Sequence, residues 1–95
     1  MHYVLIYDVV DGFVEKRKAY RQEHLAHVTK AYEDGSLVMG GALADPPDKA
    51  MMVFKSPEAD VVEAFATTDP YVTAGLVKQW RIRRWNTVSG SGTPV

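Results

Sequence analysis

Apolar positions divide the chain into four strand-like runs and two longer helical segments. The runs rich in β-branched and aromatic residues are His2–Val10, Leu37–Leu43, Ala50–Lys55 and Leu76–Thr87. Apolar residues at helical spacing predict helices over Phe13–Asp34 and from Ser56, as N-cap, to about Ala66, and a short helical turn from Asp69–Pro70 to Gly75. The order β-α-β-β-α-β predicts an α+β, ferredoxin-like domain with a four-stranded antiparallel sheet.

Two of the predicted strands are apolar on both faces. Along the first strand, Tyr3, Leu5 and Tyr7 point one way, while Val4 and Ile6 point the other way. The strand that follows the proline loop is apolar at four consecutive positions. If both helices cover one face of an antiparallel sheet, the other face is normally polar. We therefore expect a second copy of the chain to cover this face, which gives a homodimer.

Composition narrows the functions open to such a domain. The 95 residues, 46% of them hydrophobic, suit one domain, which we place at residues 1–88 with a flexible tail at 89–95. The 11 basic and 12 acidic residues give a net charge of −1, so we expect no nucleic-acid partner. There is no cysteine for a disulfide or a nucleophile, and no apolar run long enough to span a membrane. We expect a cytoplasmic protein without a membrane partner.

Three ionisable residues interrupt the apolar arc of the first helix. On a helical wheel Arg17, Arg21 and His24 fall amid the apolar residues. The opposite arc is occupied by the charged residues Glu15, Lys16, Glu23, Lys30 and Glu33. Charged groups on the inner side of a helix are costly unless they are paired or line a cavity. The pattern therefore predicts a polar site on the inner face of this helix.

Asp8 is the expected partner of His24. It is the polar residue at the end of the first strand, and it shares a face with Val4 and Ile6. If the first helix packs across this strand, the carboxylate reaches the imidazole, fixes its tautomer and makes the other nitrogen a better general base. Either arginine of the helix could then bind an anionic oxygen, such as that of a carboxylate or an enolate.

Simpler interpretations remain open for each of these residues. His24 could be a half-buried histidine bonded to a backbone carbonyl, the two arginines could reach solvent, and Asp8 could cap the turn that follows it. Asp69 is most simply an N-cap, and Tyr71 could line a pocket. A metal site of His24, His27 and Asp8 has no further dedicated ligand, so we expect no metal.

Several short motifs resemble those of the YciI-like (YCII-related) family. They are Tyr3-Val4-Leu5-Ile6-Tyr7-Asp8, Glu15-Lys16-Arg17, Arg21 with His24-Leu25, Gly40-Gly41-Ala42-Leu43, and Asp69-Pro70-Tyr71 with Ala74-Gly75. Together they extend from residue 1 to about residue 86. The resemblance implies a dimeric α/β barrel with a ferredoxin-like protomer, and a cleft whose His–Asp pair would be His24 and Asp8. Gly40-Gly41-Ala42 departs from the glycine-proline sequence that is common at this point in the family.

The same resemblance implies an enzymatic function, because the family is similar to muconolactone isomerases and to dehalogenating enzymes. We expect a cofactor-free enzyme that moves a proton next to the carbonyl of a small molecule, in an isomerisation, elimination or dehalogenation. The expected catalytic residues are His24 and Asp8, and the expected substrate-binding residues are Arg17, Arg21, Asp69 and Tyr71. The alternatives are a non-catalytic module that binds or senses a small aromatic or acidic molecule, and a heme- or flavin-linked monooxygenase of the same architecture.

Overall fold

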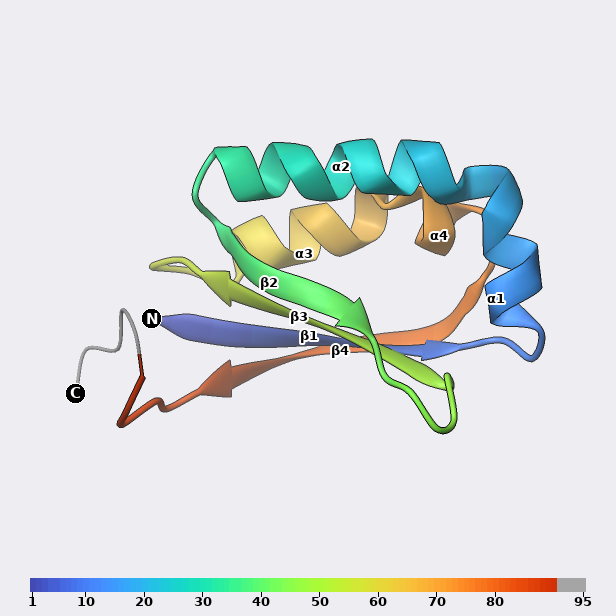
Figure 1. Cartoon of the computed structure of the whole chain (residues 1–95). Coiled ribbons are helices and arrows are strands. Elements are labelled where there is room, and N and C mark those ends of the chain that lie inside the picture. Colours follow the sequence, from blue (N-terminus) through green and yellow to red (C-terminus); the bar gives the residue numbers. More distant parts are fainter. Residues whose placement is uncertain (91–95) are drawn as a thin grey trace.

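The helices of the computed structural model cover one face of a four-stranded antiparallel sheet (Figure 1). The structure describes residues 1–90. The strands are β1 (His2–Val9), β2 (Leu37–Ala42), β3 (Lys49–Lys55) and β4 (Val77–Trp85), in the spatial order β2-β3-β1-β4. All neighbouring strands run antiparallel. The predicted α+β, ferredoxin-like fold is therefore confirmed.

The core lies between the sheet and the helices and is built around β1. Leu5 and Tyr7 point toward the helices and are 0% and 1% exposed. They belong to one apolar cluster with Phe54 of β3 and with Val62 and Phe65 of helix α3 (Asp60–Thr68). Because full burial of a large apolar side chain contributes about 1.5–3 kcal/mol, this cluster fixes which face of β1 is inside.

The predicted first helix is divided into three parts. α1 (Phe13–Lys16) leads into a 3-10 turn, η1 (Arg17–Tyr20), and then into α2 (Arg21–Glu33). A 3-10 turn has about 3.0 residues per turn, so residues on either side of η1 do not lie on one continuous helical wheel. α2 has 13 residues, and no helix among residues 1–90 is long and apolar enough to cross a membrane.

The second helix starts later than the sequence predicts. Helix α3 begins at Asp60, and Ser56 does not cap it. The hydroxyl of Ser56 donates to the carbonyl oxygen of Glu58 at 2.8 Å and accepts from the backbone N–H of Glu58 at 3.3 Å. This local turn takes up the side chain that was expected to be the N-cap.

The short helix α4 (Pro70–Thr73) begins as predicted. Asp69 is its N-cap, with Oδ1 accepting from the backbone N–H of Tyr71 at 3.0 Å, and proline occupies the first helical position. The capping bond from the N–H of Tyr71 uses one lone pair of the carboxylate. The remaining lone pairs of Asp69 are available to other donors.

The face of the sheet that points away from the helices is apolar at its centre and charged beside it. Its central apolar residues are Val4, Ile6, Met51 and Val53, which neighbour one another across β1 and β3. Asp8 lies on this face with two cations, since it accepts from Lys49 at 2.6 Å and from Arg81 at 3.0 Å. The face is therefore mixed and not apolar throughout.

Candidate functional site

His24 of α2 is hydrogen-bonded to Asp69, the cap of α4. The distance between His24 Nδ1 and Asp69 Oδ1 is 2.8 Å. Because an ionised carboxylate can only accept, Nδ1 carries the hydrogen and donates it. In the neutral ring the lone pair is then on Nε2, which is the nitrogen that can take up a proton.

Asp69 has no exposed surface, and three donors satisfy its carboxylate. Oδ1 accepts from His24 and from the backbone N–H of Tyr71, and Oδ2 accepts from the Tyr7 hydroxyl at 2.7 Å. Burial acts to raise the pKa of Asp69, but the hydrogen bond and charge of His24 and the two other donors outweigh it and hold this pKa below its ordinary value. The carboxylate is therefore an ionised, fixed acceptor behind the imidazole.

The third donor, Tyr7, is held in its protonated form. Burial, the negative charge of Asp69 and the hydrogen bond to Asp69 all raise the pKa of Tyr7 far above its usual range. The hydroxyl therefore keeps its hydrogen and donates to Asp69 throughout the physiological range of pH.

Stacking fixes the plane of the imidazole. The rings of His24 and Tyr71 are parallel to within 6°, with centroids 3.7 Å apart. The Tyr71 ring is in turn nearly perpendicular to the Phe13 ring, with centroids 5.4 Å apart, and the Tyr71 hydroxyl accepts from Arg21 at 3.2 Å. His24 is thus oriented by a hydrogen bond at one nitrogen and by an aromatic face along its ring.

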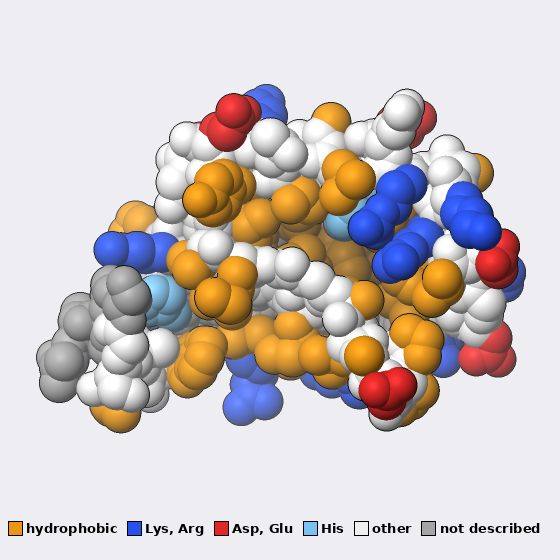
Figure 2. All heavy atoms as spheres, in the orientation of Figure 1, with side chains coloured by type: hydrophobic (Ala, Val, Ile, Leu, Met, Phe, Trp, Pro, Cys, Tyr) orange, Lys and Arg blue, Asp and Glu red, His pale blue; other side chains and the backbone are white. Residues whose placement is uncertain are grey.

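His24 lines a cavity of about 140 Å³ between α2 and the sheet. Figure 2 shows this hollow with largely apolar walls, a histidine inside it and Lys or Arg side chains at one end. The helical side is formed by Arg17, Arg21, Leu25 and Val28 together with Phe13 and Tyr71, and the sheet side by Tyr7, Gly40, Gly41, Ala42, Ala50 and Met52. The cavity therefore combines an apolar floor with two guanidinium groups and one imidazole.

The glycines of β2 form the open wall of this cavity. A Cβ at Gly40 would come within 2.7 Å of Cγ of Met52, whereas a Cβ at Gly41 would meet no atom of the described part of the chain within 4 Å. Gly40 therefore permits the close approach of β2 to the core. The departure from the glycine-proline sequence falls in this wall.

Most of the predicted site residues come together here. Arg17, Arg21 and His24, which the helical wheel placed on the inner face, all line the cavity, and Tyr71 does so as well. Asp69 lies directly behind His24 with its side chain fully buried, and so is a partner of the imidazole and not part of the cavity wall.

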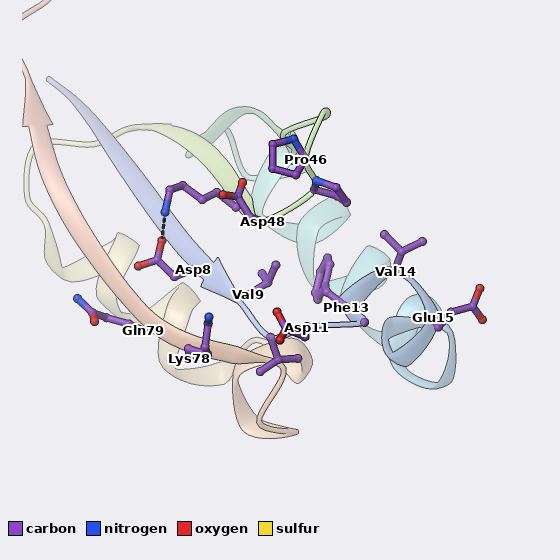
Figure 3. A pocket seen from close by; sticks show the side chains of 14 residues that line it. Asp8, Val9, Asp11, Phe13, Val14, Glu15, Pro46, Asp48, Lys78 and Gln79 are labelled. Carbon is purple, nitrogen blue, oxygen red and sulfur yellow. Dashed lines mark hydrogen bonds and ion pairs between the residues drawn. The ribbon is translucent and has the colours of Figure 1, made fainter.

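The predicted contact between Asp8 and His24 is wrong. Asp8 points to the face of the sheet opposite the helices, where it is paired with Lys49 (Figure 3) and with Arg81. The hydrogen bonds from these two cations lower the pKa of Asp8. Because side chains alternate along a strand, Asp8 cannot share a face with Leu5 and Tyr7, on which the helices pack.

Asp8 instead borders a second, wider cleft of about 720 Å³. Its walls come from the end of β1, the turn into α1, the loop before β3 and the start of β4, and include Asp11, Asp48 and Lys78 (Figure 3). None of the histidines among residues 1–90 lines this cleft. Asp8, the carboxylate that was predicted to be catalytic, is paired there with two cations.

His27 has a structural environment. Its Nε2 donates to the carbonyl oxygen of Phe65 at 2.9 Å, and its ring stacks on the Phe65 ring at 4.3 Å. Among residues 1–90, no three histidine, aspartate or glutamate side chains are grouped as a metal site would require. The imidazole of His24 is therefore the group at the cavity with a free nitrogen for proton transfer.

Sequence reasoning placed Asp69 among the substrate-binding residues but missed its bond to His24, and it missed the bond from the Tyr7 hydroxyl to Asp69. Asp69 was recognised as a cap, which by itself accounted for an aspartate before a proline. Tyr7 was placed only on a face of the first strand with Tyr3 and Leu5; its ring lies in the core, and the pattern of apolar positions says nothing of where its hydroxyl points. The signal that could have identified Asp69 as the partner of His24 is the motif Asp69-Pro70-Tyr71. This motif and the one that contains His24 both belong to the family resemblance.

The family model of the YCII-related domain matches residues 1–86, which is nearly the whole chain. The chain belongs to this family. Two curated relatives, the transcription termination factors Rho 1 and Rho 2 of Ehrlichia chaffeensis, are each 30% identical to this YCII-related chain over 80 residues. The aligned region is 83% of this chain but 18% of each relative, so the chain spans less than a fifth of their length.

Solved structures share the fold at low sequence identity. The 5-chloro-2-hydroxyhydroquinone dehydrochlorinase of Burkholderia phenoliruptrix, solved with 2,5-dihydroxybenzoquinone, aligns with a TM-score of 0.76 and 19% identity, over 98% of this chain and 99% of that one. A NIPSNAP family protein of Agrobacterium tumefaciens aligns with a TM-score of 0.60 and 16% identity, over 99% and 96%. The YCII-related chain thus has the same fold as a dehydrochlorinase.

Proposed function

We propose that this YCII-related protein is a cofactor-independent enzyme that acts on a small molecule, with His24 as its general acid and base. The observation that carries the proposal is the 2.8 Å bond from His24 Nδ1 to the buried carboxylate of Asp69, beside a cavity that His24 lines. A buried carboxylate on one nitrogen stabilises the ring when the other nitrogen takes up a proton. His24 is the catalytic residue in this scheme, and Asp69 is a positioning residue in the place where Asp8 was expected.

The proposed chemistry starts with removal of a proton from a carbon next to a carbonyl. Nε2 of His24 takes the proton, and the electrons of the broken C–H bond form an enolate. Return of the proton to a different carbon completes an isomerisation, and loss of a leaving group such as chloride completes an elimination. Asp69 stabilises the imidazolium in both cases, because its negative charge lies 2.8 Å from Nδ1.

The arginines of the cavity supply the group that would bind the enolate or another anionic oxygen. Among residues 1–90, neither Arg17 nor Arg21 forms an ion pair with a carboxylate. Arg17 lies over the ring of Phe13, at 5.5 Å from its centroid, and Arg21 donates to the hydroxyl of Tyr71. Positively charged donors without a carboxylate, at the edge of an apolar cavity, favour an anionic ligand.

The size of the cavity supports a ligand with a single ring. Its volume is about 140 Å³, and an apolar cavity of about 150 Å³ in another protein binds benzene. A dehydrochlorinase with the same fold was solved with 2,5-dihydroxybenzoquinone, a one-ring compound that carries acidic oxygens. This compound is therefore a suitable probe for the present chain.

We further propose that the protein is a homodimer, with a second copy on the sheet face opposite the helices. The support is the apolar centre of that face, formed by Val4, Ile6, Met51 and Val53. Val4 is already buried in the single chain, but Ile6, Met51 and Val53 are partly exposed, and a symmetric pair of sheets would bury what remains in water.

Chemical modification with an internal control tests whether the probe binds beside His24. Diethyl pyrocarbonate acylates free imidazole nitrogens, and the sites of modification can be identified by mass spectrometry. We expect 2,5-dihydroxybenzoquinone to protect His24 from modification and to leave the reactivity of His27 unchanged. Enzyme function requires in addition that the protein accelerate exchange of the ring hydrogens of the probe with deuterium from D₂O. Protection without exchange would indicate a binding module, and equal reactivity of His24 with and without the probe would contradict a site at this cavity.

A further inference from the structure

Among residues 1–90, Tyr7 is the one group that bonds the second oxygen of Asp69. The Tyr7 hydroxyl donates to Oδ2 at 2.7 Å, while His24 and the backbone N–H of Tyr71 both donate to Oδ1. The three donors come from three different elements, β1, α2 and α4. The carboxylate is thus tied to the sheet through one oxygen and to the helices through the other.

This division of the two oxygens matters because an aspartate carboxylate rotates easily. The torsion about its Cβ–Cγ bond is broad, and donors on both oxygens narrow that torsion more than donors on one oxygen alone. Tyr7 is 1% exposed and lies on β1, which has a neighbouring strand on each side. A donor at that position restrains the carboxylate plane from a buried, central strand.

We propose that Tyr7 is a positioning residue of the site, which locks the plane of Asp69 and thereby holds His24 in the Nδ1–H tautomer with Nε2 free toward the cavity. This inference rests on the proposed role of His24, but it concerns the state of the imidazole and not the reaction. The other charged or titratable groups that face this unit are Arg17 and Arg21 at the cavity and Tyr71 against the ring. None of them touches Oδ2 of Asp69 in the described residues.

The chain contains a matched control for a test of this role. Tyr3 lies on the same strand and the same face as Tyr7 and is 8% exposed, but its hydroxyl contacts Sδ of Met1 at 3.4 Å. Tyr7→Phe and Tyr3→Phe therefore remove the same atom from the same strand, and only the first removal affects Asp69.

The test is the tautomer of His24, read from its two ring ¹⁵N chemical shifts in protein labelled at histidine. We expect the Nδ1–H form in the wild-type protein and in Tyr3→Phe. In Tyr7→Phe the ratio of Nε2–H to Nδ1–H forms should rise at least about tenfold, the size expected from the loss of one hydrogen bond to a charged group. An unchanged ratio in a folded Tyr7→Phe protein would overturn the proposal.

A measurement on the wild-type protein covers the case in which Tyr7→Phe does not fold. The Tyr7 hydroxyl proton should exchange slowly with water and appear as a resolved downfield signal at low temperature, because it is buried and bonded to a carboxylate. Absence of this signal would mean that the bond does not persist in solution, and would also overturn the proposal. Neither result depends on turnover, so a failure here is distinct from a failure of His24 to act on a ligand.

Discussion

His24 and Asp69 are joined by a 2.8 Å hydrogen bond although 45 positions of the chain separate them. The histidine belongs to a helix that packs on the sheet, and the aspartate begins a short helix near the far end of the chain. Their contact brings a fully buried carboxylate against an imidazole that borders a cavity.

The first prediction concerns acid stability. The pKa of Asp69 in the folded protein is below its ordinary value, so its contribution to the free energy of unfolding is present above about pH 3.9 and is lost as the pH falls through the folded value. Asp69→Asn should therefore unfold more easily than the wild type at neutral pH, and the difference should shrink toward pH 2. Urea unfolding followed by circular dichroism across this range measures it.

Asp8 provides the comparison for this experiment, because its pKa is lowered as well, through hydrogen bonds from Lys49 and Arg81. The side chain of Asp8 is 22% exposed and both partners are 40% exposed, so 0.5 M salt should weaken its effect. The effect of Asp69→Asn should persist in salt because Asp69 is fully buried. If the free energy of unfolding of Asp69→Asn depended on pH as that of the wild type does, the account of the His24–Asp69 pair would be contradicted.

The contrast between Asp8 and Asp69 shows which part of the site the sequence could not predict. The pattern of apolar residues predicted the strands, the order of elements and the inner position of His24. It could not decide which face of the first strand the helices cover, because Tyr3, Leu5 and Tyr7 and the opposite residues Val4 and Ile6 are all apolar. The wrong choice of face made Asp8 the partner of His24.

The bond from His24 to Asp69 was harder to predict, because Asp69 also caps a helix. Capping alone explains an aspartate that is followed by proline. The sequence therefore gives no sign that two further donors also bond this carboxylate. The hydroxyl of Tyr7 raises the same difficulty, since its ring satisfies the core pattern whatever its oxygen contacts. Polar contacts made by residues that also fit a simple packing pattern are thus the part of this site that required a structure.

The second prediction concerns the arginines. Arg21→Gln should weaken binding of benzoate, used as a simple one-ring anion, by about ten- to a hundredfold, which corresponds to loss of one hydrogen bond from a charged donor. Lys18→Gln is the control, because it removes the same charge three residues away, where Lys18 pairs with Glu15 outside the cavity. Calorimetric titration measures both affinities. Equal affinities in the two variants would exclude a role for Arg21 in anion binding.

The third prediction concerns the cavity wall formed by β2. Gly40→Ala should reduce probe binding and lower the free energy of unfolding by about 1–3 kcal/mol, because the new Cβ comes within 2.7 Å of Met52 Cγ and forces this side chain to move. Gly41→Ala adds the same methyl group where no atom lies within 4 Å, so we expect a change below about 0.5 kcal/mol. Thermal unfolding and a binding titration compare the two. If Gly41→Ala were the more damaging, the assignment of the wall would be wrong.

The fourth prediction concerns assembly. Val53→Asp places a charge at the apolar centre of the open sheet face and should convert a dimer to monomers in sedimentation velocity at micromolar concentration. Val61→Asp is the control, since Val61 is 45% exposed on α3 in the helical layer. Circular dichroism shows whether both variants are folded. A wild-type protein that sediments as a monomer would refute the proposed dimer.

The most direct test of the central claim separates the two nitrogens of His24. In His24→Asn the amide nitrogen can replace Nδ1 as donor to Asp69, while nothing replaces Nε2 in the cavity. In His24→Gln the amide reaches toward the position of Nε2, and Asp69 loses its donor, which should lower the free energy of unfolding by about 1–3 kcal/mol.

The measurement is the rate at which the ring hydrogens of 2,5-dihydroxybenzoquinone exchange with deuterium in the presence of each protein. If His24 is the general acid and base, the wild type accelerates the exchange, and His24→Asn loses at least about a hundredfold of that acceleration while it keeps nearly wild-type stability. His24→Gln should lose both the exchange and stability. A stable His24→Asn protein that exchanges the probe as fast as the wild type would contradict the account, because proton transfer would then not require Nε2 of His24.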